Sequence, residues 1–555
     1  MKYNKKTESE VKVISTFENG KGFTQKPEKE LVGILATGIE NSFYEKENER
    51  INRLETVLTT VATKNTMFAA KALVYARTVF GQRTVTHIGA VSMIPFLSGS
   101  ELGKRFFSKR NRNKNEGGII FRIDDMAEIL ACYQAKNGVD APIPNAIKKG
   151  FKDAIEHSDA YTLAKYQMKG HGVSLIDIVN LVHPTATKVN GFVKVSLDEF
   201  KKSIKGTKFE KEYDFSKLGS EETVMEISTL RALVLGLLKQ FDTVEDKNTE
   251  AGKIVAEKVK KGEISAAQAK EELNEAKTEN YAELIKTRKI GYLALLRNVR
   301  NILKTNDKEL LNMACEQLVD EQFIKKSLVF PHQIDLALEV MIAEFGGKQL
   351  SQVANALNEA YEKSIPNLAE LFNTGRTAVV LDVSGSMSSL IQISKGKSGS
   401  TSALDKGALV AATLAKGIGA ELFVFANSCD KCKYNPLDSV NTIKNSVKHG
   451  NQVGGGTMWS TIFPRLEREG KFDRVFVISD EQGADNVESS YKGYCNKFGT
   501  PETYIINICG YAPTMIKEST HVHRLYGYTA DIYETAKRVE IDVEAVIHQI
   551  NEIEI

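Results

Sequence analysis

The first part of the chain is patterned for helices. Between about residues 60 and 370, apolar residues recur at spacings of three and four, as the buried face of a helix requires. The connections between these segments are short, and runs of β-branched residues are few. Many amphipathic helices in series predict an α-solenoid of packed helix pairs. No fixed sequence period accompanies them, so this prediction depends on the succession of helices alone.

The pattern changes type after residue 375. Short apolar, β-branched runs alternate with helical segments such as ALDKGALVAATLAKGIG; the runs are TAVVLDVS, ELFVFA, RVFVISD and ETYIINICG. Strands that are apolar throughout are buried on both faces, and helical crossovers join parallel strands. We therefore expect a helical part, residues 1–375, followed by a parallel, doubly wound α/β domain, residues 376–555.

Two polar stretches interrupt the helical part. Residues 101–118, ELGKRFFSKRNRNKNEGG, are basic and rich in Asn, and we expect a linker too polar to bury. Residues 243–287 are a charged run whose composition favours an exposed helical hairpin, inserted into the helical part. A solvated face without a function of its own is the simpler interpretation of that insertion.

Charge distribution separates the two parts further. The net charge of the whole chain is only +3. Residues 376–555 carry 19 Lys and Arg against 21 Asp and Glu, whereas residues 1–375 carry 55 Lys and Arg against 50 Asp and Glu. The helical part is therefore the better partner for a polyanion. The sequence has neither an apolar leader segment nor a run of about 18 apolar residues, and its six cysteines form no disulfide framework. We expect a cytoplasmic, reduced protein without a membrane.

Oxygen-bearing side chains follow the predicted strands of the second part. DVSGSMS begins where the first apolar run ends, one Thr follows the triple glycine of QVGGGTMWS, and one Asp ends RVFVISD. Ligands gather at the carboxyl ends of parallel strands. Hard oxygen ligands favour Mg²⁺, with Mn²⁺ or Ca²⁺ as alternatives. The predicted ligands are Asp382, Ser384, Ser386, Thr457 and Asp480.

Two carboxylates leave such a cation with residual positive charge, so the site can accept an acidic group from a partner. The competing interpretation is a Ser-rich turn with an unrelated Thr and Asp. Cys429 and Cys432 suggest zinc, but the further ligands would be oddly spaced: Cys495, Cys509, His521 and His523. The triple glycine lacks the following Lys of a phosphate loop. With no recognisable catalytic arrangement, we expect no enzyme activity.

The stretch KYQMKGHG has residues suited to RNA. Lys165 and Lys169 are four apart, on one side of a helix, where two ammonium groups can neutralise phosphates. His183 comes near the end of the following helix and can hydrogen-bond a base, sugar or phosphate. Solvated surface charges are the alternative for any single Lys. Arg83, His87 and Arg297 are lesser candidates, and Arg297 equally suits a salt bridge or a helix cap.

These motifs resemble two known families. DVSGSMS, GGGT and VISD resemble the metal-ion-dependent adhesion site of von Willebrand A domains. ARTVFGQRTVTH, AIKKGFKDAI, LAKYQMKGHGVSLIDIVNLVHP, YLALLRNVRNI and FPHQIDLAL resemble the TROVE module of Ro proteins. Two positions depart from Ro relatives: Met458 stands where they carry an acidic residue, and Asn180 where they carry a basic one.

The resemblance implies a ring of HEAT-like helical repeats, closed by a Rossmann-like von Willebrand A domain. It implies small structured (Y-like) noncoding RNA on the outer surface and single-stranded 3′ ends of misfolded RNA in the central hole. Lys165, Lys169 and His183 match family RNA contacts. We expect a monomeric, non-catalytic RNA chaperone or scaffold of RNA quality control, with an exoribonuclease or another acidic protein as partner at the metal. The alternatives are a metal-dependent protein-adhesion adaptor and a nuclease.

Overall fold

The computed structural model describes residues 11–555 except 41, 112–113, 167–171, 186–187, 190, 214, 216–223, 239–254, 256–257, 259–260, 262, 328, 330, 366–367, 389, 393–399, 450–451 and 529–530. Contacts between residues divide the chain into two compact units. We call residues 51–241 with 547–555 the helical unit, and residues 1–50 with 242–546 the mixed unit. Within the described residues, no helix is long and apolar enough to cross a membrane.

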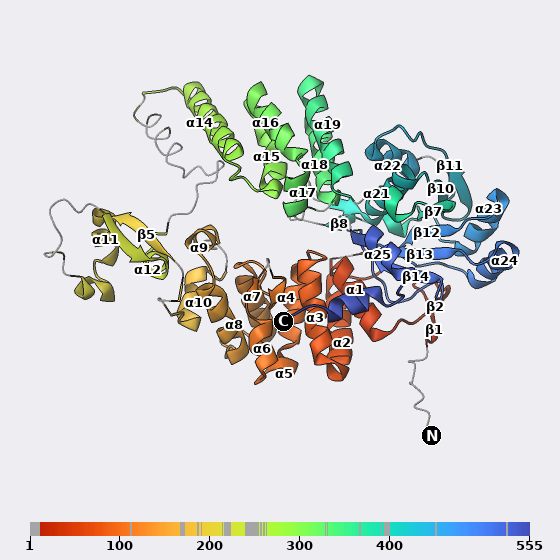
Figure 1. Ribbon diagram of the computed structural model, residues 1–555, viewed down its shortest axis with the longest axis horizontal. Coiled ribbons are helices and arrows are strands. Elements are labelled where there is room, and N and C mark those ends of the chain that lie inside the picture. Colours follow the sequence, from red (N-terminus) through yellow and green to blue (C-terminus); the bar gives the residue numbers. More distant parts are fainter. Residues whose placement is uncertain are drawn as a thin grey trace. The chain divides into compact units, whose positions relative to one another are not determined.

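The helical unit is built from short helices whose starts are capped by side chains. Asn65, Ser100, Asp159 and Ser174 each accept a hydrogen bond from the first turn of the helix that follows. The helices are α2 (Glu47–Lys64), α3 (Thr66–Thr78), α4 (Thr84–Ser92), α5 (Ile94–Leu97), α6 (Glu101–Phe106), α7 (Asp125–Asn137), α8 (Asn145–Glu156), α9 (Ala160–Lys165) and α10 (Leu175–Val182). Neighbours pack in succession, α3 on α4, α4 on α7, and α8 on both α6 and α10 (Figure 1).

The remainder of the helical unit combines a hairpin with short helices. It contains β5 (Phe192–Ser196), α11 (Leu197–Ile204), the 3-10 turn η1 (Lys208–Glu212), β6 (Val224–Ser228) and α12 (Thr229–Val234). β5 and β6 pair antiparallel. The chain's last helix, α26 (Ala545–Asn551), extends into this unit, where Lys71 donates to the Asn551 carbonyl over 2.6 Å.

The stretch 101–118 is not the unburied linker that its composition suggested. It forms α6 and the two-residue strands β3 (Arg110–Asn111) and β4 (Glu116–Gly117). Phe106 and Phe107 are fully buried, and Arg110 is only 2% exposed. The Arg110 guanidinium donates to three backbone carbonyls, those of Asn115, Gly117 and Glu554. Backbone acceptors therefore satisfy a charge that the sequence pattern assigned to solvent.

The mixed unit contains an array of longer helices. They are α14 (Ala266–Lys286), α15 (Tyr292–Thr305), α16 (Lys308–Leu318), α17 (Glu321–Ser327), α18 (Pro331–Glu344), α19 (Gly347–Lys363) and α20 (Leu368–Leu371). α14 is the second half of the charged run that begins near residue 243. Tyr281 and Ile285 on it are buried against α15 and α16, so this half is packed on one side rather than fully solvated. Most of the first half lies outside the described residues.

A six-stranded sheet forms the second layer of the mixed unit, in the order β11-β10-β7-β12-β13-β14. The strands are β7 (Thr377–Asp382), β10 (Glu421–Phe425), β11 (Cys429–Cys432), β12 (Arg474–Ser479), β13 (Glu502–Asn507) and β14 (Val522–Tyr526). All neighbours are parallel except β11, which returns antiparallel to β10 at the edge. The sequence predicted a wholly parallel sheet and missed this tight hairpin, so the sheet is mixed.

Both faces of this sheet are buried. Val379 and Leu381 of β7 belong to the larger core, and Ala378 and Val380 to a second one. The covering helices are α21 (Ala403–Ile418), α22 (Val440–His449), α23 (Ile462–Glu469), α24 (Glu488–Phe498) and α25 (Asp531–Val539) (Figure 1). Three small elements complete the domain: the hairpin of β8 (Leu390–Gln392) and β9 (Ser400–Ser402), the 3-10 turn η3 (Ser386–Ser388) and the 3-10 turn η5 (Trp459–Thr461).

The N-terminal segment packs onto the same sheet. A hairpin of β1 (Val13–Ser15) and β2 (Lys21–Phe23) leads into α1 (Pro27–Thr37), which packs on β14. Phe23 and Thr514 exchange backbone hydrogen bonds of 2.9 and 3.1 Å. Gly33 is needed in α1, because a Cβ there would come within 2.8 Å of the Tyr526 ring. Residues almost 500 positions apart therefore share one layer.

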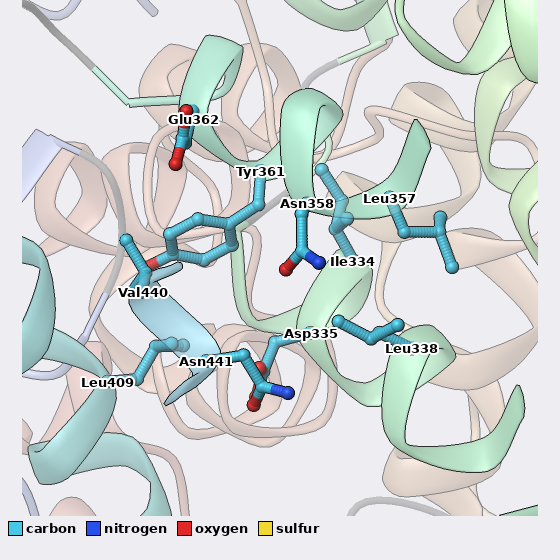
Figure 2. A pocket seen from close by; sticks show the side chains of 10 residues that line it. All are labelled: Ile334, Asp335, Leu338, Leu357, Asn358, Tyr361, Glu362, Leu409, Val440 and Asn441. Atoms are coloured by element: carbon cyan, nitrogen blue, oxygen red, sulfur yellow. The ribbon is translucent and has the colours of Figure 1, made fainter. Parts of the chain in front are cut away.

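The helix array and the sheet domain meet at a small pocket. Figure 2 shows side chains of α18, α19, α21 and α22 lining it: Ile334, Asp335, Leu338, Leu357, Asn358, Tyr361, Glu362, Leu409, Val440 and Asn441. Next to it, the fully buried Lys444 of α22 donates to Asp335 and Glu339 of α18 over 2.9 and 2.6 Å. Burial raises the pKa of Asp335, although Lys444 acts against this rise. This buried ion pair fixes α22 on α18.

Candidate functional site

The predicted metal ligands gather at one edge of the sheet. β7 and β12 lie side by side, and the chain leaves β7 towards β10 on one side while β12 leads to β13 on the other. This is the point where strand order reverses, the place where doubly wound sheets bind ligands. Asp382 is the last residue of β7, and Asp480 directly follows β12.

The loop after β7 curls back on Asp382. The Ser384 backbone N–H donates to Asp382 Oδ1 over 2.9 Å, and the Ser384 and Ser386 hydroxyl oxygens are 3.3 Å apart. From β12, the Ser479 hydroxyl donates to Asp382 Oδ2 over 2.5 Å. The carboxylate of Asp382 is thus fixed by hydrogen bonds, and the two loop hydroxyls lie beside it.

Thr457 directly follows the triple-glycine loop, which positions it. The Gly385 N–H donates to the Gly455 carbonyl over 3.0 Å, and the Thr457 carbonyl accepts from the Ala484 N–H over 2.9 Å. Gly454 has φ 92°, and a Cβ there would collide with Asn427, so glycine is required. These bonds join the loops after β7 and β12 and leave Thr457 only 3% exposed.

The electrostatics of this cluster suit a cation. Burial raises the pKa of Asp382 to about 6. Burial first, and then the charge of Asp382, raises the pKa of Asp480 to about 7. Asp480 Oδ2 is buried, and among the described residues it has no hydrogen-bond partner. Two carboxylates, one of which has this unpaired oxygen, and three hydroxyls form a donor set that a hard divalent cation can occupy.

Glu481 directly follows Asp480 but forms a buried ion pair and does not belong to the predicted ligands. Its backbone adopts the left-handed conformation, with φ 60°. The buried Glu481 carboxylate accepts from Arg524 in two bonds of 2.8 Å. It also accepts from Asn507 over 3.0 Å and from the Met515 N–H over 3.1 Å. Nothing in the local sequence distinguishes this acid from a ligand, because its partners come from β13, β14 and the loop between these strands.

Two residues of the N-terminal segment also reach the site, and the sequence pattern gave no sign of them. The Tyr44 hydroxyl donates to the Glu18 carboxylate. Burial and this bond raise the pKa of Tyr44, while a hydrogen bond with the Ser386 hydroxyl acts against the rise. Tyr44 thus connects an exposed acid to one of the predicted ligands.

The RNA candidates of KYQMKGHG are only partly visible. Lys165 is the last residue of α9, and its side chain is outside what the structure describes, as is Lys169 entirely. His183 is exposed, in a left-handed conformation at the C-terminal end of α10 (φ 46°). These residues remain predictions, with His183 placed where a ligand can reach it.

Two lysines that the sequence argument passed over lie close to this helix end. Just after His183, the Thr185 N–H donates to Glu156 of α8 over 2.7 Å. Burial would raise the pKa of Glu156, but the bonds from Thr185 and the nearby charges of Lys152 and Lys188 lower it. The end of α10 is therefore held against α8 in a basic neighbourhood.

Two of the three lesser RNA candidates, His87 and Arg83, have partners within the protein. His87 is 2% exposed, and its Nε2 is 3.1 Å from Asp125 Oδ1. Arg83, which is 37% exposed, pairs with Asp124 over 2.9 Å. His87 therefore has almost no surface to offer an RNA and belongs to a buried structural cluster, a correction to its candidate role. Arg297 is exposed on α15 of the mixed unit.

The zinc alternative has no support from the described residues. No group of three or more His, Cys, Asp or Glu that could hold a metal occurs there. Burial raises the pKa of the Cys429 thiol to about 12, which disfavours the thiolate that zinc needs. His521 and His523 both contact Glu502, over 2.6 and 2.7 Å.

A comparison with models of protein families identifies the family of this chain. The model of the TROVE domain matches residues 25–371, well over half of the 555 residues. The chain belongs to the TROVE-domain family and is thus of the RNA-binding class. The match to the TROVE domain ends shortly before β7. The two compact units defined by contacts between residues have other boundaries, at residues 50, 241 and 546. The proposed boundary near 375 therefore remains a prediction from the sequence.

Among solved structures, the chain is similar to the crystal structure of the Ro (RSR) protein of Deinococcus radiodurans. The identity is 14% and the TM-score 0.46, over 93% of this chain and 100% of that one. No curated protein matches the sequence.

Proposed function

We propose that this protein binds small structured, Y-like noncoding RNAs and the single-stranded 3′ ends of misfolded RNAs. The supporting observation is the concentration of positive charge in one unit. The helical unit carries 28 Lys and Arg against 21 Asp and Glu, and the mixed unit 46 against 50. A basic surface attracts phosphates regardless of sequence, and single strands enter places from which a stiff duplex is excluded.

In this proposal the protein is a non-catalytic scaffold or chaperone of RNA quality control. The exposed His183, with Lys152 and Lys188 nearby, belongs to the RNA-binding surface together with Lys165 and Lys169. We further propose a monomeric, cytoplasmic protein. All six cysteines are free, as in a reducing compartment.

The metal centre has a separate role in this proposal. Asp382, Ser384, Ser386, Thr457 and Asp480 would hold Mg²⁺ or a similar divalent cation in a von Willebrand A-type domain. When bound, the cation supplies positive charge that attracts an acidic group of a partner, such as an exoribonuclease. The protein-adhesion adaptor is the second candidate function. It is favoured by the buried Asp480 Oδ2, which has no hydrogen-bond partner among the described residues and could hold the cation that an adaptor needs.

A salt-titrated binding assay tests the RNA proposal. A hairpin with a 3′ tail should bind more tightly than a blunt duplex of equal length, and the Lys165→Glu/Lys169→Glu variant should weaken both. Lys433→Glu/Lys492→Glu is the matched control, because both lysines are exposed in the mixed unit. Equal binding by all proteins and RNAs would leave the adaptor function in its place.

Calorimetry with Mg²⁺ tests the metal proposal. Asp382→Ala should abolish measurable binding, because it removes one of two carboxylates, while the fold persists by circular dichroism. Asp430→Ala is the control, since this exposed carboxylate lies on β11 of the same sheet. Unchanged Mg²⁺ affinity in Asp382→Ala and Asp382→Asn would reject the site.

A further inference from the structure

Two arginines share one carboxylate at the start of α7. Arg122 donates from two nitrogens to Asp124, from Nε to Oδ1 over 3.0 Å and from Nη2 to Oδ2 over 2.9 Å. Arg83, which directly precedes α4, donates to the same Oδ2 over 2.9 Å, so the two guanidinium groups are close neighbours. The side chains of Arg83 and Arg122 are 37% and 36% exposed, and that of Asp124 is 16% exposed. One shared carboxylate therefore faces two cations at the surface.

The neighbouring acid does not restore the balance of charge. Asp125 is fully buried and accepts from Arg77 over 2.9 Å and from the backbone N–H groups of Phe121 and Arg122 over 3.0 and 2.8 Å. Its distance from the Arg83 guanidinium is 3.6 Å, too long for a hydrogen bond. Among the described residues, the buried Nε–H of Arg83 has no hydrogen-bond partner. Arg83 is therefore only partly satisfied there, and an anion can recruit it without breaking the buried cluster.

An aromatic ring lies against this arginine pair. The guanidinium carbon of Arg122 is 5.0 Å from the centroid of the Tyr166 ring. Tyr166 directly follows α9, and its side chain is part-exposed. Guanidinium groups bind phosphates with paired donors, and aromatic rings stack on unpaired bases. The cluster therefore offers a contact for each half of one nucleotide.

We propose that Arg83, Arg122 and Tyr166 form a binding site for one nucleotide of single-stranded RNA. The two guanidinium groups bind its phosphate, and its base stacks on the Tyr166 ring. This inference rests on the proposed RNA-binding function. It adds a contact that a duplex does not make, because paired bases stack on one another. Tyr166 comes directly after Lys165, so the site continues the RNA-binding surface predicted from KYQMKGHG.

Fluorescence anisotropy with single-stranded decamers tests the ring on the full chain. The probes are oligoadenylate and an abasic ribose-phosphate strand of equal length. Tyr166→Leu should bind oligoadenylate about tenfold more weakly than the wild type, as expected for one lost base stack, and the abasic strand equally well. Tyr166→Phe should behave like the wild type, because the ring is kept. Tyr213→Leu is the matched control, since this ring of the same unit also lies against an arginine, Arg231, at 5.4 Å.

The arginines should act through the phosphate. Arg83→Gln should weaken the binding of both strands about fivefold. The slope of log affinity against log salt should fall by about 0.7, as expected for one lost phosphate contact of a single strand. Arg231→Gln is the control, because Arg231 is a part-exposed arginine of the same unit that pairs with Glu212 over 2.9 Å. Photocrosslinking of a thiouridine oligomer to the wild type needs no variant, and the crosslink should map to Tyr166.

The possible results separate this site from the proposed function. If Lys165→Glu/Lys169→Glu weakens RNA binding, but Tyr166→Leu and Arg83→Gln behave like their controls and no crosslink maps to Tyr166, the nucleotide site is wrong and the proposed function stands. If Tyr166→Leu weakens both strands equally, no base stacks on the ring and the inference fails. If the wild type binds neither the strands nor a tailed hairpin, the site and the RNA-binding function both fail.

Discussion

The candidate metal site of the mixed unit and the RNA candidates of the helical unit differ most in burial. Asp382, Ser384 and Asp480 are fully buried, and backbone or side-chain hydrogen bonds hold each loop. His183 is exposed at a helix end, close to two lysines. A small hard cation needs converging oxygens, whereas a polyanion needs charges spread over a solvated surface. The proposed metal site is therefore buried and fixed, whereas the proposed RNA contacts lie on an exposed surface.

Each unit also contains a buried ionic cluster. Beside the candidate metal site, Glu481 pairs with Arg524. In the helical unit, Asp125 of α7 accepts from Arg77 of α3 over 2.9 Å and contacts His87 of α4. Both acids are fully buried. Removing one partner of a buried pair costs more than the pair contributes, because the other charge is left unpaired.

The largest effect should come from Asp125→Asn. This variant keeps the shape of the side chain but leaves Arg77 buried without a counter-charge, and should lower the free energy of unfolding by about 3–5 kcal/mol. Urea denaturation measures it. Asp124→Asn is the control, because Asp124 pairs with the part-exposed Arg83 and Arg122 and should cost under about 1 kcal/mol. Equal losses would show that α7 does not depend on the buried cluster.

The same cluster predicts a pH dependence. Burial would raise the pKa of Asp125, but hydrogen bonds and charges from His87 and Arg77 hold it well below the usual value of 3.8 for an aspartate. A carboxyl with a depressed pKa stabilises the folded state above its unfolded pKa, and this contribution is lost as the pH falls through the folded value. The difference between wild type and Asp125→Asn should therefore be constant near neutrality and shrink below about pH 4. A difference that grows in acid would contradict the assignment.

The local sequence predicted more of the candidate metal site than of the candidate RNA surface. The ligands follow apolar runs, so strand ends alone bring Asp382 and Asp480 together. Glu18 and Tyr44 were not predicted, because a contact between the N-terminal segment and the loop after β12 leaves no periodic pattern. Arg110 was wrongly assigned to an exposed linker, since only the folded chain reveals its carbonyl partners. β11 was missed because its run, CDKC, is polar and short.

Mg²⁺ should stabilise the region of the metal centre. A ligand that binds only the folded state adds about 1.4 kcal/mol at ten times its dissociation constant. Thermal unfolding with and without Mg²⁺ should show this gain in the wild type and in Asp430→Ala, but not in Asp382→Ala. A gain that persists in Asp382→Ala would place the bound cation elsewhere and remove the contrast between the two regions.

The basic neighbourhood of His183 predicts a smaller effect, on RNA affinity. Lys152→Glu/Lys188→Glu should weaken binding of a 3′-tailed hairpin about fivefold, roughly 1 kcal/mol. The slope of log affinity against log salt should also fall by about 1.5, as expected for two lost phosphate contacts. The control Lys433→Glu/Lys492→Glu changes charge equally in the mixed unit. If both variants act alike, net charge alone drives binding and the helical unit has no special surface.

The smallest expected effect distinguishes a role of the His183 ring in RNA binding from a role of its backbone at the helix end. His183 ends α10 in a left-handed conformation, which glycine adopts without strain, so His183→Gly should keep or raise the free energy of unfolding by under about 1 kcal/mol. Asn306→Gly is the counterpart, because Asn306 ends α15 of the mixed unit in the same conformation, φ 61°. Both variants should have similar stability, but only His183→Gly should weaken RNA binding, about threefold, or roughly 0.7 kcal/mol. Unfolding curves and binding isotherms measured on the same samples decide this. An unchanged RNA affinity in His183→Gly would mean that the histidine serves the helix end alone, and that phosphate contacts by lysines account for the whole surface.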